Sequence, residues 1–346
     1  MKKTIIMSIV AAMALQLSTA CTDYLYDGTV DLTVAEKPFD YPENYEFNHP
    51  CALVTQDDID RVKSHVEAAD ETDAVYASWK HLCDNTYARI PYTPNPQKIL
   101  VRGDATNTGV AGENYINACR DAAAAFQLAL RWHISGDAQY ADAAVNVLNQ
   151  WADVCEQITA NDNNQFLLAG FQGYQFANAA ELLRGYDGWA AADQADFKQW
   201  LLDVWYAKNY WFIENHGGSN VCDLHYWPNW ELANLASILA IGIYTDNVEM
   251  VNFVYKNFRE GKGSGAINHM IPYDPVPDPD IEGCMIAQNM ESGRDQGHAT
   301  LVVAVCAEMC QMAWNIGLDF WGMENNKVLA MAEYTAKWNC KPEGQF

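Results

Sequence analysis

Helical periodicity dominates the chain after residue 50. Apolar positions recur every three or four residues, the spacing of a helix that buries one face, and strand-like alternation is scarce. The sequence therefore predicts an all-α protein, with almost no sheet outside the N-terminal arm and residues 261–293. The predicted helices are 57–69, 72–86, 115–135, 138–157, 174–185, 191–214, 228–244, 248–260, 295–316 and 325–338.

Most of these helices form antiparallel pairs joined by short polar turns. A weak internal repeat links residues 130–137 with 239–246: an apolar helix end, a tight polar turn and an amphipathic return helix. Such hairpins stack side by side as a superhelix or an α/α toroid, here an incomplete barrel. No Gly/Ser-rich linker divides residues 51–346, so we expect a single domain there, after an irregular N-terminal arm at 21–50.

Four long loops each precede the first helix of a hairpin. If the hairpins stack in one sense, these loops meet at one end of the domain. Rigid scaffolds carry their functional residues on such loops, so we expect the site at that end. The loops are 86–114, 158–173, 216–227 and 261–293.

The first twenty residues have the pattern of an export signal. Lys2 and Lys3 precede an apolar core at 5–17 that is too short to span a bilayer. The small residues before Cys21 suit either ordinary cleavage or a displaced lipobox, and we favour the lipobox, which would make Cys21 a lipid anchor. We therefore expect an exported protein in the periplasm or at the outer membrane of a gram-negative envelope.

Composition excludes some classes of partner. The formal net charge is −24 and no basic face is evident, which argues against nucleic acid. The ten cysteines lack zinc-ribbon spacing. We expect most of them to be buried small apolar residues with no assignable pairing, and neither a metal nor a cofactor is predicted. The sequence gives no oligomeric state.

The first candidate site is the segment His225-Tyr226-Trp227-Pro228-Asn229-Trp230. Pro228 fits the first position of a helix, which places Asn229 in its first turn and His225 just outside it. A helix N-terminus with a free amide and an imidazole can receive a carboxylate. The alternative interpretation is a buried aromatic cluster whose histidine is only hydrogen-bonded.

The second candidate site is the segment 291–298. Ser292 and Asp295 have the spacing of a capping box that opens the next helix. Arg294 and His298 are four residues apart, so they share a face of that helix start. Arg294 either binds substrate or forms an ion pair with Glu291 or Asp295.

Four further residues are weaker candidates for binding substrate. Asn178 lies one turn into its helix, after a loop that contains Gln172, and Asn117 opens another helix, where capping alone would explain it. Tyr273 lies among prolines in a long loop. Aromatic residues make up 12% of the chain, which suits stacking on sugar rings, as for Trp230, but equally suits a helical core.

Four stretches resemble the alginate-lyase-like superfamily of helical-toroid polysaccharide lyases: 117–151, 175–181, 225–230 and 293–298. The resemblance spans about residues 50–338, and the last two stretches are its most specific part. It implies an α/α toroid that cleaves alginate, glucuronan or a related polyuronate. In the best-known branch, an adjacent Asn–His pair and an Arg–Tyr pair carry out the chemistry.

This chain departs from that pattern at the segments named above. His225 and Asn229 are separated, and no tyrosine follows Arg294 at the equivalent spacing, so Tyr226 is assigned by proximity alone. In β-elimination, Asn229, Arg294 and Asn178 would offset the charge of the uronate carboxylate. Neutral His225 would take the C5 proton and a tyrosine would protonate the leaving O4; no metal is required.

Two other functions compete with a lyase. A glycoside hydrolase needs two nearby carboxylates, for which Glu181, Glu231, Asp223 and Glu291 are available. A glycan-binding lipoprotein would suit the N-terminus and would leave its oligosaccharide intact. The concentration of polar side chains at two helix starts exceeds what stacking on sugars requires, which favours the lyase.

Overall fold

The computed structural model describes Tyr41, residues 44–216 and residues 223–340. The expected export signal and Cys21 lie outside these residues. The chain divides into a unit Met1–Phe39 and a unit Asp40–Phe346, and the second contains every described residue. No helix among the described residues has the length and apolar character needed to cross a bilayer.

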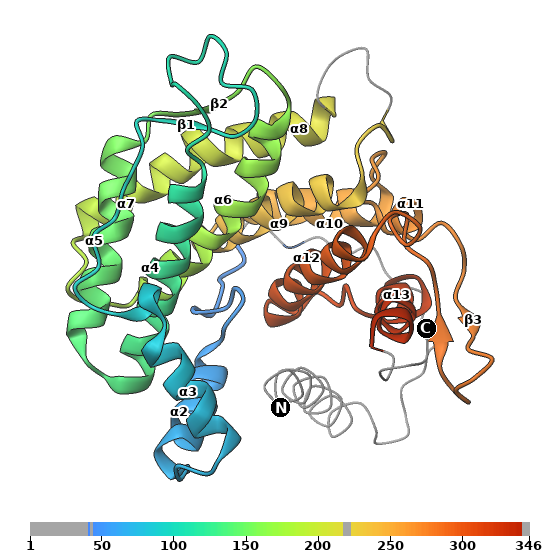
Figure 1. Cartoon of the computed structure of the whole chain (residues 1–346), viewed down its shortest axis with the longest axis horizontal. Helices are drawn as coiled ribbons and strands as arrows, with labels where there is room; N and C mark the ends of the chain where they lie inside the picture. Colours follow the sequence, from blue (N-terminus) through green and yellow to red (C-terminus); the bar gives the residue numbers. More distant parts are fainter. Residues whose placement is uncertain (1–40, 42–43, 217–222, 341–346) are drawn as a thin grey trace. The chain divides into compact units, whose positions relative to one another are not determined.

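The second unit is built from consecutive helical hairpins (Figure 1). The first helices of four hairpins are α4 (Ile116–Ser135), α6 (Asn164–Leu183), α9 (Pro228–Tyr244) and α12 (Gln296–Asn315). They form an inner row in which α6 packs against α4 and α9, and α9 packs against α12. The return helices form an outer row: α5 (Ala138–Val154), the continuous segment α7 (Ala191–Trp200), η2 (Leu201–Tyr206) and α8 (Ala207–Asn215), then α10 (Val248–Glu260) and α13 (Met323–Asn339).

This arrangement confirms the predicted all-α toroid. A further hairpin of α2 (Gln56–Ala68) and α3 (Ala74–Asp84) precedes the inner row and is followed by the short helix η1 (Thr86–Ala88); α11 (Ile267–Met270) lies between α10 and α12. Thr55 caps α2 through a capping box with Asp58, which satisfies donors at the helix start.

Two short two-stranded sheets complete the fold. Strands β3 (Val276–Pro277) and β4 (Met285–Ile286) pair antiparallel, within the region where strand was expected. Strands β1 (Ile99–Val101) and β2 (Gln157–Thr159) pair in parallel. This pair of three-residue strands is the small amount of sheet outside the expected regions, and it forms because two long loops lie side by side and satisfy each other's backbone hydrogen bonds.

Helices α6 and α9 form the centre of the core. The sequence predicts a loop at 158–173, but α6 begins at Asn164 and is buried along most of its length. A Cβ added to Gly170 would lie 2.8 Å from the backbone of Ala233 in α9. Gly170 therefore does not mark a turn; it lies inside a helix and allows α6 and α9 to pack closely.

The inner helices all begin at the same end of the domain, and their preceding loops contact one another there. Asn161 donates a hydrogen bond to Asp104 over 3.0 Å, and Asn163 donates one to the Tyr226 hydroxyl. The Arg294 guanidinium lies 5.6 Å from the centre of the Trp227 ring. These contacts confirm the prediction that the long loops meet.

The cysteines in the described residues are all free thiols. Four of these eight cysteines are buried, three are half-buried and Cys340 is exposed, so the expectation that most are buried holds for only half of them. The buried ones are Cys51, Cys155, Cys306 and Cys310.

Candidate active site

An aromatic cluster surrounds the N-terminus of α9. The Tyr226 ring lies 4.8 Å from the Trp230 ring and 5.3 Å from the Phe212 ring of α8. The exposed His225 imidazole stands edge-on to Tyr226, with 4.8 Å between the ring centres. The structure thus brings together three residues that the sequence predicts for the site: His225, Tyr226 and Trp230.

Asn229 lies in the first turn of α9, as predicted, with Pro228 at the helix start. Its side chain is only 3% exposed, and its Oδ1 atom has no hydrogen-bond partner among the described residues. A buried polar atom without a partner is costly, so such atoms concentrate where a ligand completes the bonding.

Arg294 connects the second candidate segment to this cluster. Its guanidinium forms an ion pair with the fully buried Glu291 at 3.3 Å and also lies over Trp227. Arg294 therefore forms the ion pair with Glu291 that was one of its two interpretations from the sequence. The same side chain is 39% exposed and remains next to α9.

The start of α12 differs from the predicted capping box. Asp295 itself caps the helix by accepting a hydrogen bond from the His298 backbone over 2.8 Å, and its other oxygen lies 2.6 Å from His298 Nδ1. The Ser292 hydroxyl instead accepts from the Asn289 backbone over 3.0 Å. His298 is consequently fixed to its own helix start.

Other predicted binding residues lie outside the cluster. Asn178 accepts a hydrogen bond from the Leu53 backbone over 2.9 Å, so it anchors the N-terminal arm. Gln172 lies within α6 rather than in a loop and is 5% exposed. Asn117 accepts from Asn95 over 3.2 Å, and Tyr273 is 70% exposed in the loop before β3.

The pair Asn215-His216 was missed in the sequence. α8 ends at Asn215, and His216 follows in a left-handed conformation with φ of 44°. Non-glycine residues rarely adopt this conformation, and such strain concentrates at functional sites. The two residues form an adjacent Asn–His pair of the kind that the family resemblance implies. We looked in the sequence for polar residues at helix starts, and these two residues lie at a helix end. Their adjacency was the only sequence signal that pointed to them.

His216 is held between two carboxylates. Its Nε2 atom lies 3.7 Å from Glu231 Oε1 and its Nδ1 atom lies 3.6 Å from Asp223 Oδ1. His216 is 6% exposed, and the neighbouring Glu231 carboxylate raises the pKa of its imidazole above the usual 6.5. A buried histidine beside an orienting carboxylate is the usual arrangement of a general base.

Glu231 is in turn fixed by the loop after α10. Its Oε2 atom accepts a hydrogen bond from the Gly265 backbone over 2.8 Å. A Cβ added to Gly263 would lie 2.0 Å from the same carboxylate. The absence of side chains at these glycines therefore lets the loop enclose Glu231, which is 2% exposed.

A cation and an exposed aromatic ring lie along α8. Lys208 donates a hydrogen bond to Gln165 over 2.6 Å, and burial lowers the pKa of its ammonium group. Trp211 stacks on Phe166 with 4.9 Å between ring centres and is 42% exposed. The Lys208 ammonium lies 5.6 Å from the centre of the Phe166 ring, and an exposed indole near a cation suits the stacking of sugar rings that carry negative charge.

The fold and this site define a class, the helical-toroid polysaccharide lyases. The family model for alginate lyase matches residues 62–269, and the chain belongs to that family. None of the curated proteins matches the chain.

Solved structures show the same fold. The crystal structure of alginate lyase A1-III from Sphingomonas species A1 is 15% identical, with a TM-score of 0.60 over 88% of this chain and 82% of that one. An alginate lyase from Bacteroides ovatus is 14% identical, with a TM-score of 0.61 over 85% of each chain. A variant of A1-III complexed with tetrasaccharide is 13% identical, with a TM-score of 0.60 and the same coverage as the Sphingomonas structure.

Proposed function

We propose that the protein is a polysaccharide lyase that cleaves a uronic-acid glycan, such as alginate or glucuronan, by β-elimination. The observation that carries this proposal is the buried His216, held by Glu231 and preceded by Asn215. Family membership supports the general class, and the polar groups around the start of α9 support the substrate class. An envelope location stays a prediction, because the N-terminal residues lie outside the described part of the chain.

The first requirement of the reaction is to offset the charge of the uronate carboxylate, so that the C5 proton becomes acidic. The unpartnered amide oxygen of Asn229 is an acceptor and suits a sugar hydroxyl, whereas its NH₂ group and the backbone donors of the first turn of α9 suit the uronate carboxylate. Asn215 and Arg294 add an amide and a guanidinium from neighbouring segments. Donors placed in advance around a developing charge supply a large share of catalysis.

The second requirement is a base and an acid. His216 takes the C5 proton, the C–H electron pair forms the C4=C5 double bond, and the C4–O4 bond breaks. Tyr226 donates a proton to the leaving O4; its hydroxyl is already positioned by a hydrogen bond from Asn163. His225, the base predicted from sequence, is the second candidate for that role because it contacts the same tyrosine.

The carboxylate pair of a hydrolase has less support. Glu181 lies in the last turn of α6, at the other end of that helix from the candidate active site, and contacts His49 there. Glu291 is paired with Arg294, and Glu231 is engaged by Gly265. Two of the carboxylates considered for a hydrolase are therefore bound to other groups, and a third is remote.

The test is incubation of the full chain with alginate, glucuronan and other polyuronates while ultraviolet absorbance is followed. A lyase creates an unsaturated uronate that absorbs, and a neutral glycan of similar length serves as the control. Release of reducing sugar without absorbance would assign the protein to the hydrolases. Binding of intact oligosaccharide without either product would make it a glycan-binding protein.

A further inference from the structure

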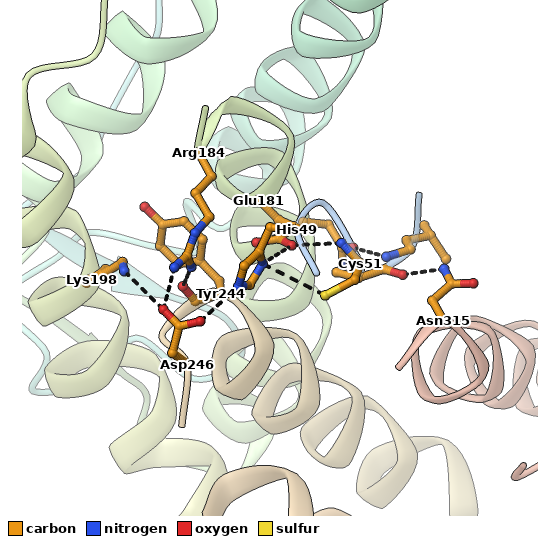
Figure 2. A network of polar contacts seen from close by, with 11 residues as sticks. His49, Cys51, Glu181, Arg184, Lys198, Tyr244, Asp246 and Asn315 are labelled. Carbon is orange, nitrogen blue, oxygen red and sulfur yellow. Dashed lines mark hydrogen bonds and ion pairs between the residues drawn. The ribbon is translucent and has the colours of Figure 1, made fainter. Parts of the chain in front are cut away.

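A second polar cluster lies at the ends of α6 and α9 opposite the candidate active site (Figure 2). His49, in the N-terminal arm, contacts Glu181 through Nδ1 at 2.6 Å and Asp246 through Nε2 at 2.8 Å. The Cys51 thiol lies 3.8 Å from the same Nδ1 atom, and the Cys51 backbone donates to Glu181 over 2.9 Å. Three chemically different ligand groups thus converge on one point.

Two features are not explained by ion pairing alone. Glu181 is 2% exposed, yet its Oε2 atom has no hydrogen-bond partner among the described residues. The Cys51 thiol is buried beside the His49 imidazole, and its backbone contacts the Glu181 carboxylate. One potential ligand atom from each of His49, Cys51 and Glu181 lies within 4.8 Å of the other two.

The outer contacts resemble the surroundings of a metal-bound histidine. A ligating histidine usually donates its other ring N–H to a carboxylate, which fixes the tautomer and the ring orientation. Here Asp246 lies at that position on Nε2, and it is itself held by Arg184, with Lys198 at 3.8 Å. The Arg184 guanidinium also donates to the Tyr244 carbonyl over 2.7 Å, so the supporting carboxylate is fixed.

We propose that His49 Nδ1, Cys51 Sγ and a Glu181 carboxylate oxygen form a zinc site that fastens the N-terminal arm to α6. The sulfur ligand with nitrogen and oxygen favours Zn²⁺ over Mg²⁺ or Ca²⁺, which take oxygen ligands. Bonds of about 2.0–2.3 Å require small shifts of the Glu181 and Cys51 side chains. Water completes the coordination as the fourth ligand.

Charge is conserved when zinc enters this cluster. The imidazolium and the thiol each lose one proton, and Zn²⁺ replaces the two protons, so the net charge of His49, Cys51 and Glu181 does not change. No oxidation or reduction is involved. The competing arrangement is a protonated His49 that bridges two carboxylates without metal.

The experiment is a titration of the full chain with Co²⁺ after treatment with a chelator. Cobalt bound to a thiolate gives a charge-transfer absorption band, which should saturate at one equivalent. The band should be lost in Cys51→Ser and weakened in Glu181→Gln. Cys155→Ser is the matched control, because Cys155 is also a buried thiol but lies at the end of α5, and it should keep the band.

A second measurement is the melting temperature with and without one equivalent of zinc. Zinc should raise it for the wild type and for Cys155→Ser, and should leave Cys51→Ser unchanged. Absence of a thiolate band in the wild type would overturn the proposal, and this result does not depend on how any variant folds. A band that persists in Cys51→Ser would place the metal on other cysteines and would overturn it equally.

Discussion

At the scale of single residues, the base is the assignment that matters most. His216 is buried and held by Glu231, whereas His225 is exposed at the edge of the same cluster. We expect His216→Ala to lower kcat by about 10²–10⁴-fold, the usual contribution of a general base. His225→Ala is the matched control and should lower turnover much less. Turnover is measured on samples whose circular dichroism matches the wild type, and the reverse order of effects would return the base to His225.

The pH dependence of the reaction tests the same residue. The base acts in its neutral form, and contact with Glu231 raises the pKa of His216 above 6.5. The rising limb of kcat/KM should therefore have its midpoint above pH 6.5, with activity lost as pH falls through it. Glu231→Gln removes the negative charge, so the midpoint should move down toward 6.5. An identical pH profile in the variant would separate His216 from the proton transfer.

Arg294 combines a structural contact with a proposed role in binding. Arg294→Ala leaves the fully buried Glu291 without its cationic partner, which should cost about 1–3 kcal/mol in the free energy of unfolding. The double variant Arg294→Ala/Glu291→Gln should regain much of that stability. If Arg294 also binds the substrate carboxylate, turnover stays low in the double variant, as thermal melts and rate assays on one sample would show. Recovery of activity together with stability would limit Arg294 to the ion pair.

At the scale of helices, the crossing of α6 and α9 depends on a missing side chain. Gly170→Ala places a methyl group 2.8 Å from the Ala233 backbone, so the helices must separate. We expect a loss of about 1–3 kcal/mol or more, as for other overpacked core positions. Gly185→Ala is the control, because nothing lies within 4 Å of its added Cβ. Denaturant unfolding of both variants measures the difference, and equal stability would mean that the crossing is not tight.

The sequence predicts some helices well and others poorly, for physical reasons. α9 and α10 begin where predicted because Pro228 and the Asn247 cap determine their first turns. α6 begins before its predicted start because it is buried on nearly all sides, so no polar face marks where it begins.

The residues of the candidate site were likewise predicted in part. The start of α9 was found because its polar groups are neighbours in sequence. The contact of His216 with Glu231 crosses the loop between α8 and α9, and that of His49 with Glu181 joins residues 132 positions apart. No local sequence pattern carries that information.

At the scale of the whole molecule, charge opposes the proposed substrate. The chain carries a formal net charge of −24, which repels a polyuronate at long range while Arg294 and Lys208 act only locally. Salt screens the long-range repulsion first, with a Debye length of about 10 Å at 0.1 M. We expect kcat/KM to rise with added salt up to about that concentration, more for long polymers than for short oligomers. A steady fall from the lowest salt would show that local attraction dominates the encounter.

The arm that precedes the first hairpin contacts structure formed much later in the chain. The Ala52 carbonyl accepts a hydrogen bond from Asn315 at the end of α12, 263 residues away, and the Tyr41 backbone donates to Asn252, 211 residues away. Each helical hairpin can form from local contacts as it leaves the ribosome, whereas pairings of this span are slow to form. The contacts of the arm with α6 can form when half of the chain has been made, whereas its contact with α12 can form only after nearly the whole domain has been synthesised.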